Sequence, residues 1–168
     1  YPLFISAFFN PSTKDARLSF KTNNLTVSSL VTTSKKRELS KKLKNLSVSI
    51  SLDAFTNISE KKLSYSSSGN LQYLIGTNDV FFFFFDFSGD EKEISFSRLN
   101  AESSFCKADF SGGFDFKNFS LFGFLDVKKI KLKSGLEISS EIYFDRLEKG
   151  FMAFSPQVFL GEKIFTAL

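Results

Sequence analysis

The sequence predicts an all-β fold, an elongated antiparallel sheet curved into an open, taco-like groove with an apolar inner face. The first observation is residues 46–54, where Leu46, Val48, Ile50 and Leu52 alternate with polar residues. Successive side chains of a strand point to opposite faces, so this strand has one apolar and one hydrated surface. The second observation is that turn signals recur about every 8–15 residues, which is typical of an antiparallel meander. The third is the content of 24 Phe and no Trp. Strands with this much Phe require a thick apolar partner to pack against.

The same alternation predicts the strands of the N-terminal half. They are expected at residues 2–9, 15–22, 25–31, 46–54, 62–75 and 79–88. Gly69 is expected to form a bulge or bend within its strand, because glycine inside a strand often marks such a feature. Residues 79–88 are apolar on both faces, so this strand is expected to be central or to lie under another element.

Residues 34–45 are the exception to this rhythm. Leu39, Leu43 and Leu46 are spaced four and three apart, behind Ser34 as an N-cap. This spacing permits a short helix, and a basic polar connection is the alternative.

The C-terminal half is expected to be a meander of shorter strands. We expect strands at 93–101, at 104–113, two or three within 113–135, one in 136–150, and two in 151–168. The last two are separated near Pro156 and Gly161. A loose unit of strand, glycine or asparagine, and strand recurs throughout, and the chain begins without Met. Residues 1–168 are therefore expected to be a single section of a longer repetitive β-sheet protein.

Composition argues against several function classes. The chain has no His and one cysteine, Cys106, which argues against zinc sites, imidazole catalysis and disulfides. No pair of carboxylates stands out, so we expect no catalytic residues, no metal site, no cofactor and no enzymatic activity. The net charge of +4 is concentrated in a basic run at 35–44, which is not interleaved with aromatics, so nucleic acid is not an expected partner. No apolar run approaches about 20 residues, so no membrane-spanning helix is expected.

Two architectures satisfy a long series of such strands. In a closed sandwich or barrel the apolar faces meet each other, whereas in an open curved sheet they line a trough. The uniform bulk of Phe and the short polar residues on the opposite face favour the trough. Sequence alone leaves open which Phe row of residues 80–87 faces inward. The expected lining is Leu46, Val48, Ile50, Leu52, Phe81, Phe83, Phe85, Phe114, Phe116, Ile138, Ile142 and Phe144.

The run YSSSGNLQYLIGTNDVFFFFFDFSG, followed by ISFSRLNAESSFCKADFSGGFDFKNFSLFGFLDVKKIKLKSG, resembles the repetitive β-regions of AsmA-like proteins, especially TamB-type translocation and assembly modules. The resemblance covers roughly residues 46–145 and rests on alternation and glycine. It implies a long hydrophobic β-groove in the bacterial envelope, anchored in the inner membrane and crossing the periplasm. The glycines that fall where the family places bends are Gly69, Gly76, Gly112, Gly113, Gly123 and Gly135.

This resemblance implies a role in moving phospholipid between the inner and outer membranes and in outer-membrane biogenesis. The expected partners are phospholipid acyl chains and an outer-membrane assembly barrel protein. The expected location is the periplasm, with the anchor outside this chain. Two alternatives remain: a fragment of an outer-membrane β-barrel, and a structural β-solenoid whose Phe rows form a dry core.

Overall fold

The computed structural model describes residues 3–26, 45–75, 78–148 and 150–166, and all regular secondary structure there is β-strand. The strands are β1 (Leu3–Asn10), β2 (Asp15–Thr26), β3 (Leu46–Asn57), β4 (Lys62–Ile75), β5 (Asp79–Asp90), β6 (Glu93–Glu102), β7 (Cys106–Asp115), β8 (Ser120–Lys131), β9 (Glu137–Arg146), β10 (Phe151–Phe154), β11 (Gln157–Leu160) and β12 (Lys163–Thr166).

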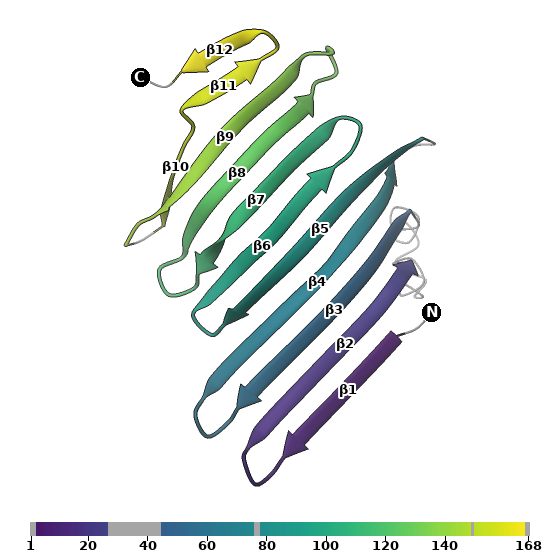
Figure 1. Ribbon diagram of the computed structural model, residues 1–168, viewed down its shortest axis with the longest axis vertical. Helices are drawn as coiled ribbons and strands as arrows, with labels where there is room; N and C mark the ends of the chain where they lie inside the picture. Colours follow the sequence, from purple (N-terminus) through teal and green to yellow (C-terminus); the bar gives the residue numbers. More distant parts are fainter. Residues whose placement is uncertain (1–2, 27–44, 76–77, 149, 167–168) are drawn as a thin grey trace, which may run out of the picture.

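The strands form one 12-stranded antiparallel sheet in which chain neighbours are spatial neighbours from β1 to β9 (Figure 1). Two short strands, β10 and β11, pair with different parts of β9, and β12 follows β11 at the far end. β1 and β12 end the strand order, so the sheet is open. This confirms the predicted open antiparallel sheet, and the alternative of a closed sandwich or barrel is not adopted by the described residues.

Two sequence-based predictions for the C-terminal half were wrong. Residues 113–135 were expected to hold two or three short strands, but β7 runs on to Asp115 and β8 is a single strand of 12 residues. Gly123 does not interrupt β8, because it pairs in register with Gly112 inside the sheet. Residues 151–168 were expected to hold two strands, but the described part holds three, since β11 and β12 form their own hairpin around Gly161.

The prediction of a bulge or bend at Gly69 was also wrong. Gly69 pairs in unbroken register with Ile50 on one side and Phe85 on the other. The register instead shifts in β2 before Leu25, in β6 between Phe96 and Leu99, and in β8 between Val127 and Ile130. Such bulges bend a strand and increase its twist, so they, and not the glycines, mark the irregular points of this sheet.

Some expectations fall outside the described residues. Of the predicted helix or basic connection at 34–45, only Asn45 is described, where its side-chain amide donates a hydrogen bond to the Leu74 carbonyl. Of the predicted strand at 25–31, residues 25–26 are described and complete β2.

The register divides the side chains of the sheet between two faces. Val48, Leu71 and Phe83 are directly opposite one another on β3, β4 and β5, so they share a face that we call the apolar face. Followed across the sheet, the principal residues of the apolar face are Leu18, Phe20, Leu46, Val48, Ile50, Leu52, Leu71, Phe81, Phe83, Phe85, Phe87, Ile94, Phe96, Leu99, Phe110, Phe114, Leu121, Leu125, Val127, Ile138, Ile142 and Phe144.

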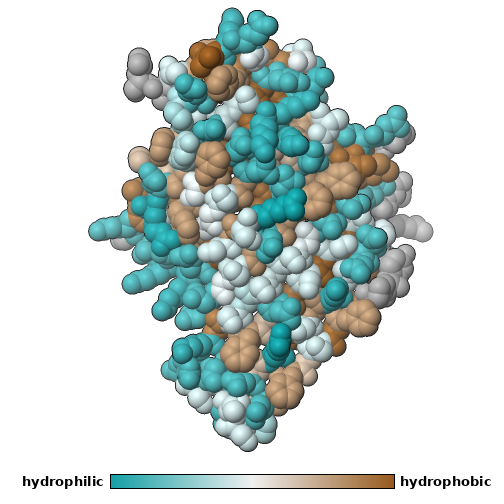
Figure 2. Space-filling model, in the orientation of Figure 1, coloured by the Kyte–Doolittle hydropathy of each residue, from teal (hydrophilic) through white to brown (hydrophobic). Residues whose placement is uncertain are grey.

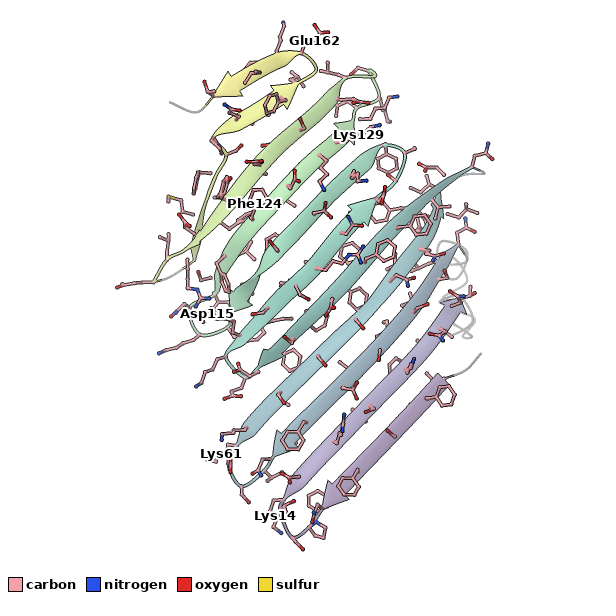
Figure 3. The ribbon with its side chains drawn as sticks, viewed as in Figure 1. Lys14, Lys61, Asp115, Phe124, Lys129 and Glu162 are labelled. Carbon is pink, nitrogen blue, oxygen red and sulfur yellow. The ribbon has the colours of Figure 1, made fainter. Side chains whose placement is uncertain are left out.

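The opposite side, which we call the polar face, carries the serines of β3, the serines of β4 except Ser67, and most of the charged side chains of β6 to β9. Figure 2 shows a surface of this character, where hydrophilic and near-neutral residues dominate and hydrophobic residues are scattered. Lys14 and Lys61 lie at the tips of the β1–β2 and β3–β4 hairpins, at the same end of the strands (Figure 3). Both have left-handed backbone angles (φ 59° and 52°). The polar face and the hairpin tips are therefore suited to water.

The apolar face is not covered by a second layer within the described part of the chain. Val127 is the one hydrophobic side chain there that is buried, while the other rows remain half-exposed. The accessible surface is 11643 Å², whereas a compact monomer of this mass exposes roughly 8,400 Å². The apolar face, which has no second layer over it within the described residues, contributes to this larger area.

Candidate functional site

The structure gathers the predicted lining residues on the apolar face, apart from Phe116. The row of β3, Leu46 to Leu52, is in register with the row of β5 that contains Phe81, Phe83 and Phe85. Phe114 on β7 and Ile138, Ile142 and Phe144 on β9 project from the same side. The structure thus places the odd-numbered Phe row of β5 with the other apolar rows, and Phe82 and Phe84 on the polar face.

Phe116 lies beyond the end of β7, in the turn to β8. Its ring contacts that of Phe114 with centroids 5.6 Å apart, and its side chain is 40% exposed. It therefore extends the apolar face toward a hairpin tip, whereas the expectation was a position within the lining.

Five aromatic rings form a continuous line across the apolar face, which we call the aromatic row: Tyr65, Phe87, Phe96, Phe110 and Phe144. Successive ring centroids lie 6.4, 5.9, 6.0 and 6.1 Å apart, and each contact is edge-to-face. This geometry places the positive edge of one ring against the negative face of the next. The row runs from β4 to β9, perpendicular to the strands, and so spans about 24 Å at the usual strand spacing.

Glycine on β8 permits the last step of the aromatic row. Phe110 on β7 reaches Phe144 on β9 over β8, where Gly123 is the residue opposite Phe144. A Cβ at Gly123 would lie 2.2 Å from the Ser111 carbonyl oxygen and 2.6 Å from the Gly112 Cα. The paired glycines therefore keep the backbones close and leave no side chain between the two rings.

A second line of rings crosses the aromatic row along β5. Phe83 and Phe85 have centroids 6.4 Å apart, and Phe85 and Phe87 are 6.0 Å apart. The side chains at positions i and i+2 of a strand share a face, so the alternation of β5 alone produces this line. Phe87 belongs to both lines and is their junction.

Sequence reasoning missed four members of the aromatic row: Tyr65, Phe87, Phe96 and Phe110. Their signal was present, because each stands in an alternating segment in phase with apolar neighbours. What the sequence did not contain was the register, which places these residues of four different strands in one line.

Two titratable side chains on the apolar face, Tyr65 and Cys106, have pKa values raised by burial. Burial raises the pKa of the Tyr65 hydroxyl, and the nearby Asp90 carboxylate adds to the effect. Burial likewise raises the pKa of the Cys106 thiol. Because the neutral forms dominate at neutral pH, neither group disturbs the apolar character of this face.

Charged side chains on the polar face are joined by hydrogen bonds between neighbouring strands. The Asp109 carboxylate accepts hydrogen bonds from the Asn100 amide and from Lys128 Nζ, the latter at 2.5 Å. These two donors hold the pKa of Asp109 below its usual value, with Lys128 as the larger cause. Lys128 stands at the bulge of β8, so this network links β6, β7 and the irregular part of β8.

A second polar cluster surrounds Arg146 at the end of β9. One guanidinium nitrogen lies 2.9 Å from Glu93 Oε2 on β6, and the other lies 3.5 Å from Asp115 Oδ2 on β7. The guanidinium also stacks over the Phe122 ring of β8, 3.9 Å from its centroid. One side chain thus joins four strands, which stabilises the part of the sheet that carries the C-terminal end of the aromatic row.

The described residues contain no group of three or more His, Cys, Asp or Glu side chains arranged to hold a metal ion. Within the same part of the chain, no helix is long and apolar enough to cross a membrane. The most distinctive feature of the molecule is therefore a surface, the apolar face with its aromatic row. A scan of protein-family models and searches of curated proteins and of solved structures found no match to the chain.

Proposed function

We propose that this chain is a section of a bacterial envelope protein whose apolar face conducts phospholipid between the inner and outer membranes. In this proposal the acyl chains lie along the aromatic row while the headgroups stay in water. The section stands in the periplasm as part of a protein anchored in the inner membrane. It supports outer-membrane biogenesis, with an outer-membrane assembly barrel protein as a partner.

The observation that carries the proposal is the uncovered apolar face. Fully burying a Phe side chain contributes roughly 1.5–3 kcal/mol, so the half-exposed Phe rows of β5 to β9 leave a large free energy unrealised in water. Soluble proteins rarely expose a contiguous apolar patch of more than a few hundred Å². Acyl chains would cover this face without any second protein layer.

The length and uniformity of the aromatic row favour acyl chains as the occupant. The row spans about 24 Å, whereas the tails of one bilayer leaflet span about 15 Å, half of the hydrocarbon core. A tail aligned with the row would therefore have room to shift along it. Because each step is an edge-to-face contact of similar length, a moving tail would meet a similar aromatic contact at each ring of the row.

Transport along such a surface needs no covalent chemistry. The neutral Tyr65 and Cys106 impose no charge on the tails, and the polar face offers serines and ion pairs to the aqueous periplasm. The resemblance to AsmA-like proteins supports the same location and cargo.

Photo-crosslinking at two adjacent Phe positions tests the proposal. A photoreactive phenylalanine analogue is introduced at Phe85, on the apolar face, or at Phe84, on the polar face next to Arg98. The two sites differ by one residue and by the face they project from. We expect phospholipid adducts at position 85 in bacterial cells, and at most a few per cent of that yield at position 84.

Equal yields at the two positions, or adducts to protein alone at position 85, would contradict the proposal. Protein adducts alone would indicate that the Phe rows meet another apolar protein layer. Native mass spectrometry of the purified chain provides an independent check, because bound phospholipid should accompany it.

A further inference from the structure

Two pockets on the polar face combine the same kinds of side chain. The first has a volume of about 370 Å³ and lies over β2, β3 and β4, where its lining includes Arg17, Asp53, Phe55, Ser64 and Ser66. The second has a volume of about 280 Å³ and lies over β6, β7 and β8, where its lining includes Arg98, Asp109, Ser111, Phe124, Asp126 and Lys128. Each pocket therefore offers an arginine, carboxylate and hydroxyl groups, and a phenyl ring.

The charges of each pocket balance. In the first, Arg17 and Asp53 form one ion pair, with 3.8 Å between the guanidinium nitrogen and the carboxylate oxygen. In the second, the cations Arg98 and Lys128 accompany two carboxylates. A phosphate or an organic cation would meet a like charge in either pocket, so the electrostatics favour a neutral ligand. Hydrogen bonds to charged groups are stronger than those between neutral groups, so a ligand with many hydroxyls gains most.

Exposed aromatic rings stand beside these charged groups. Arg17 is directly opposite Phe8 of β1 and Phe55 of β3, which are 63% and 42% exposed. In the second pocket Phe124 begins a line of rings on the polar face, with the Tyr143 centroid 5.0 Å away. A ligand that satisfies both parts presents C–H groups and hydroxyls side by side. The pyranose ring of a sugar has this chemistry, because its C–H groups are weakly positive and aromatic faces are negative.

Two β-bulges shape the second pocket. Ser97 lies in the register shift of β6, and Lys128 lies in that of β8. Bulges re-aim side chains and are over-represented next to functional sites. Arg98 is held over the Phe84 ring, 5.0 Å from its centroid, and Lys128 Nζ lies 2.5 Å from Asp109 Oδ2. Both cations are therefore fixed before a ligand binds, which reduces the entropy that binding costs.

We propose that the polar face binds a neutral oligosaccharide that crosses the strands from one pocket to the other. The pockets are centred on β3 and β7, and so lie about 19 Å apart at the usual strand spacing. Between them, Asn70 and Phe84 are directly opposite each other on β4 and β5. An extended β-linked sugar chain contacts both pockets, with sugar rings against Phe55 and Phe124 and hydroxyls bonded to the arginines and carboxylates.

The two faces make this inference independent of the proposed function. Lipid contacts Phe85 on the apolar face, whereas sugar contacts Phe55 and Phe124 on the polar face. If both proposals hold, one section of the sheet binds acyl tails and a glycan at the same time. Loss of glycan binding would leave the lipid adducts at position 85 unchanged, and loss of those adducts would leave glycan binding unchanged.

Isothermal titration calorimetry with two hexasaccharides tests the proposal. The whole chain is held in a detergent without a sugar headgroup, which covers the apolar face. The probes are chitohexaose, an extended β-linked chain of N-acetylglucosamine, and maltohexaose, a curved α-linked chain of glucose. We expect saturable binding of chitohexaose, and binding of maltohexaose that is weaker by about tenfold or more. Chitobiose, which is too short to contact both pockets, should also bind more weakly by about tenfold or more.

Substitutions in the two pockets test whether the glycan contacts both. Phe124→Ala and Arg17→Ala should each raise the dissociation constant of chitohexaose about tenfold. Phe119→Ala is the matched control and should leave the affinity unchanged, because Phe119 is 73% exposed in the β7–β8 turn and lies outside both pockets. Arg17 is exposed and has one long ion pair, so Arg17→Ala should keep the β circular dichroism and remains informative if Phe124→Ala does not fold.

No binding of chitohexaose, or equal affinities for chitohexaose and maltohexaose, would overturn the proposal. So would Arg17→Ala and Phe124→Ala variants that bind chitohexaose as tightly as Phe119→Ala does.

Discussion

The ring of Phe85 on β5 lies over Gly69 on β4, its directly opposite partner. A Cβ at Gly69 would be 2.8 Å from Phe85 Cζ and 2.2 Å from the Ser49 carbonyl oxygen. The same relationship joins Tyr65 to Gly89 on the apolar face and Phe122 to Gly113 on the polar face. An aromatic ring laid over a facing glycine covers the exposed backbone and helps to fix the strand register.

The Phe85–Gly69 pair predicts that Gly69→Ala destabilises the sheet. The new methyl group meets a backbone oxygen that cannot move without disturbing β3, so we expect a loss of about 1–3 kcal/mol in the free energy of unfolding. Urea unfolding followed by circular dichroism measures it. Ser68→Ala, at the neighbouring exposed position, serves as the control and should change stability by under about 0.5 kcal/mol. A Gly69→Ala variant as stable as this control would refute the close packing.

The two faces of β5 predict opposite effects of a lysine. Phe83→Lys or Phe85→Lys places a charge on the apolar face and should abolish lipid transfer, because a charge in an acyl environment is expensive. Phe82→Lys, on the polar face opposite Glu102, should retain both transfer and fold. Transfer between donor and acceptor vesicles, with circular dichroism of each variant, separates these outcomes. Unfolding of the apolar-face variants would indicate a dry interior in place of a lipid surface.

The Arg146 cluster predicts a graded loss of stability. Arg146→Ala removes two ion pairs and the stacking over Phe122, so we expect a loss of about 1–2 kcal/mol. Arg146→Lys keeps the charge but loses the planar group that stacks over Phe122. Its free energy of unfolding should lie between those of the unsubstituted protein and Arg146→Ala. Arg17→Ala removes one long ion pair, 3.8 Å from Asp53 with both partners exposed, and should have almost no effect. Equal changes in the free energy of unfolding for Arg146→Ala and Arg17→Ala would show that the ion pairs and the stacking of Arg146 do not stabilise the sheet.

The lowered pKa of Asp109 predicts an acid-sensitive contribution to stability. Its folded pKa is below the unfolded value of about 3.9, so its stabilisation is complete above that value and is lost as the pH falls through the folded pKa. Asp109→Asn cannot make the charged contact with Lys128. The gap in thermal midpoint between the two proteins should therefore be largest near pH 6–7 and shrink below about pH 4. A gap that is the same at pH 7 and pH 3 would contradict the assignment.

Much of the fold was predictable from local pattern. The strand of residues 62–75 was predicted with the bounds that the structure shows, and 46–54 differs only by an extension to Asn57. Alternation works here because each strand has one apolar face, so the period of two is visible in the residues themselves. Alternation did not predict the role of the glycines, because the sequence alone does not distinguish a glycine packed under an aromatic ring from a glycine at a bend.

The candidate site was predictable only in part. The apolar rows of β3, β5 and β9 could be assigned from alternation, as Val48, Phe83 and Ile142 show. The aromatic row could not, because Tyr65, Phe87, Phe96, Phe110 and Phe144 come from five strands and meet only through register. The bulges at β6 and β8 change that register by one residue, and nothing in Ser97 or Lys128 marks them as bulge positions.

The sequence by itself determined the strands and the character of their two faces, since a side chain's face depends on its position in the chain. Tertiary structure alone decided that the sheet formed by the described residues stays open, and that Phe81, Phe83 and Phe85 join the face of Val48 while Phe82 and Phe84 do not. These outcomes depend on pairing between residues far apart in the chain, and a period of two is equally compatible with every register that keeps its parity.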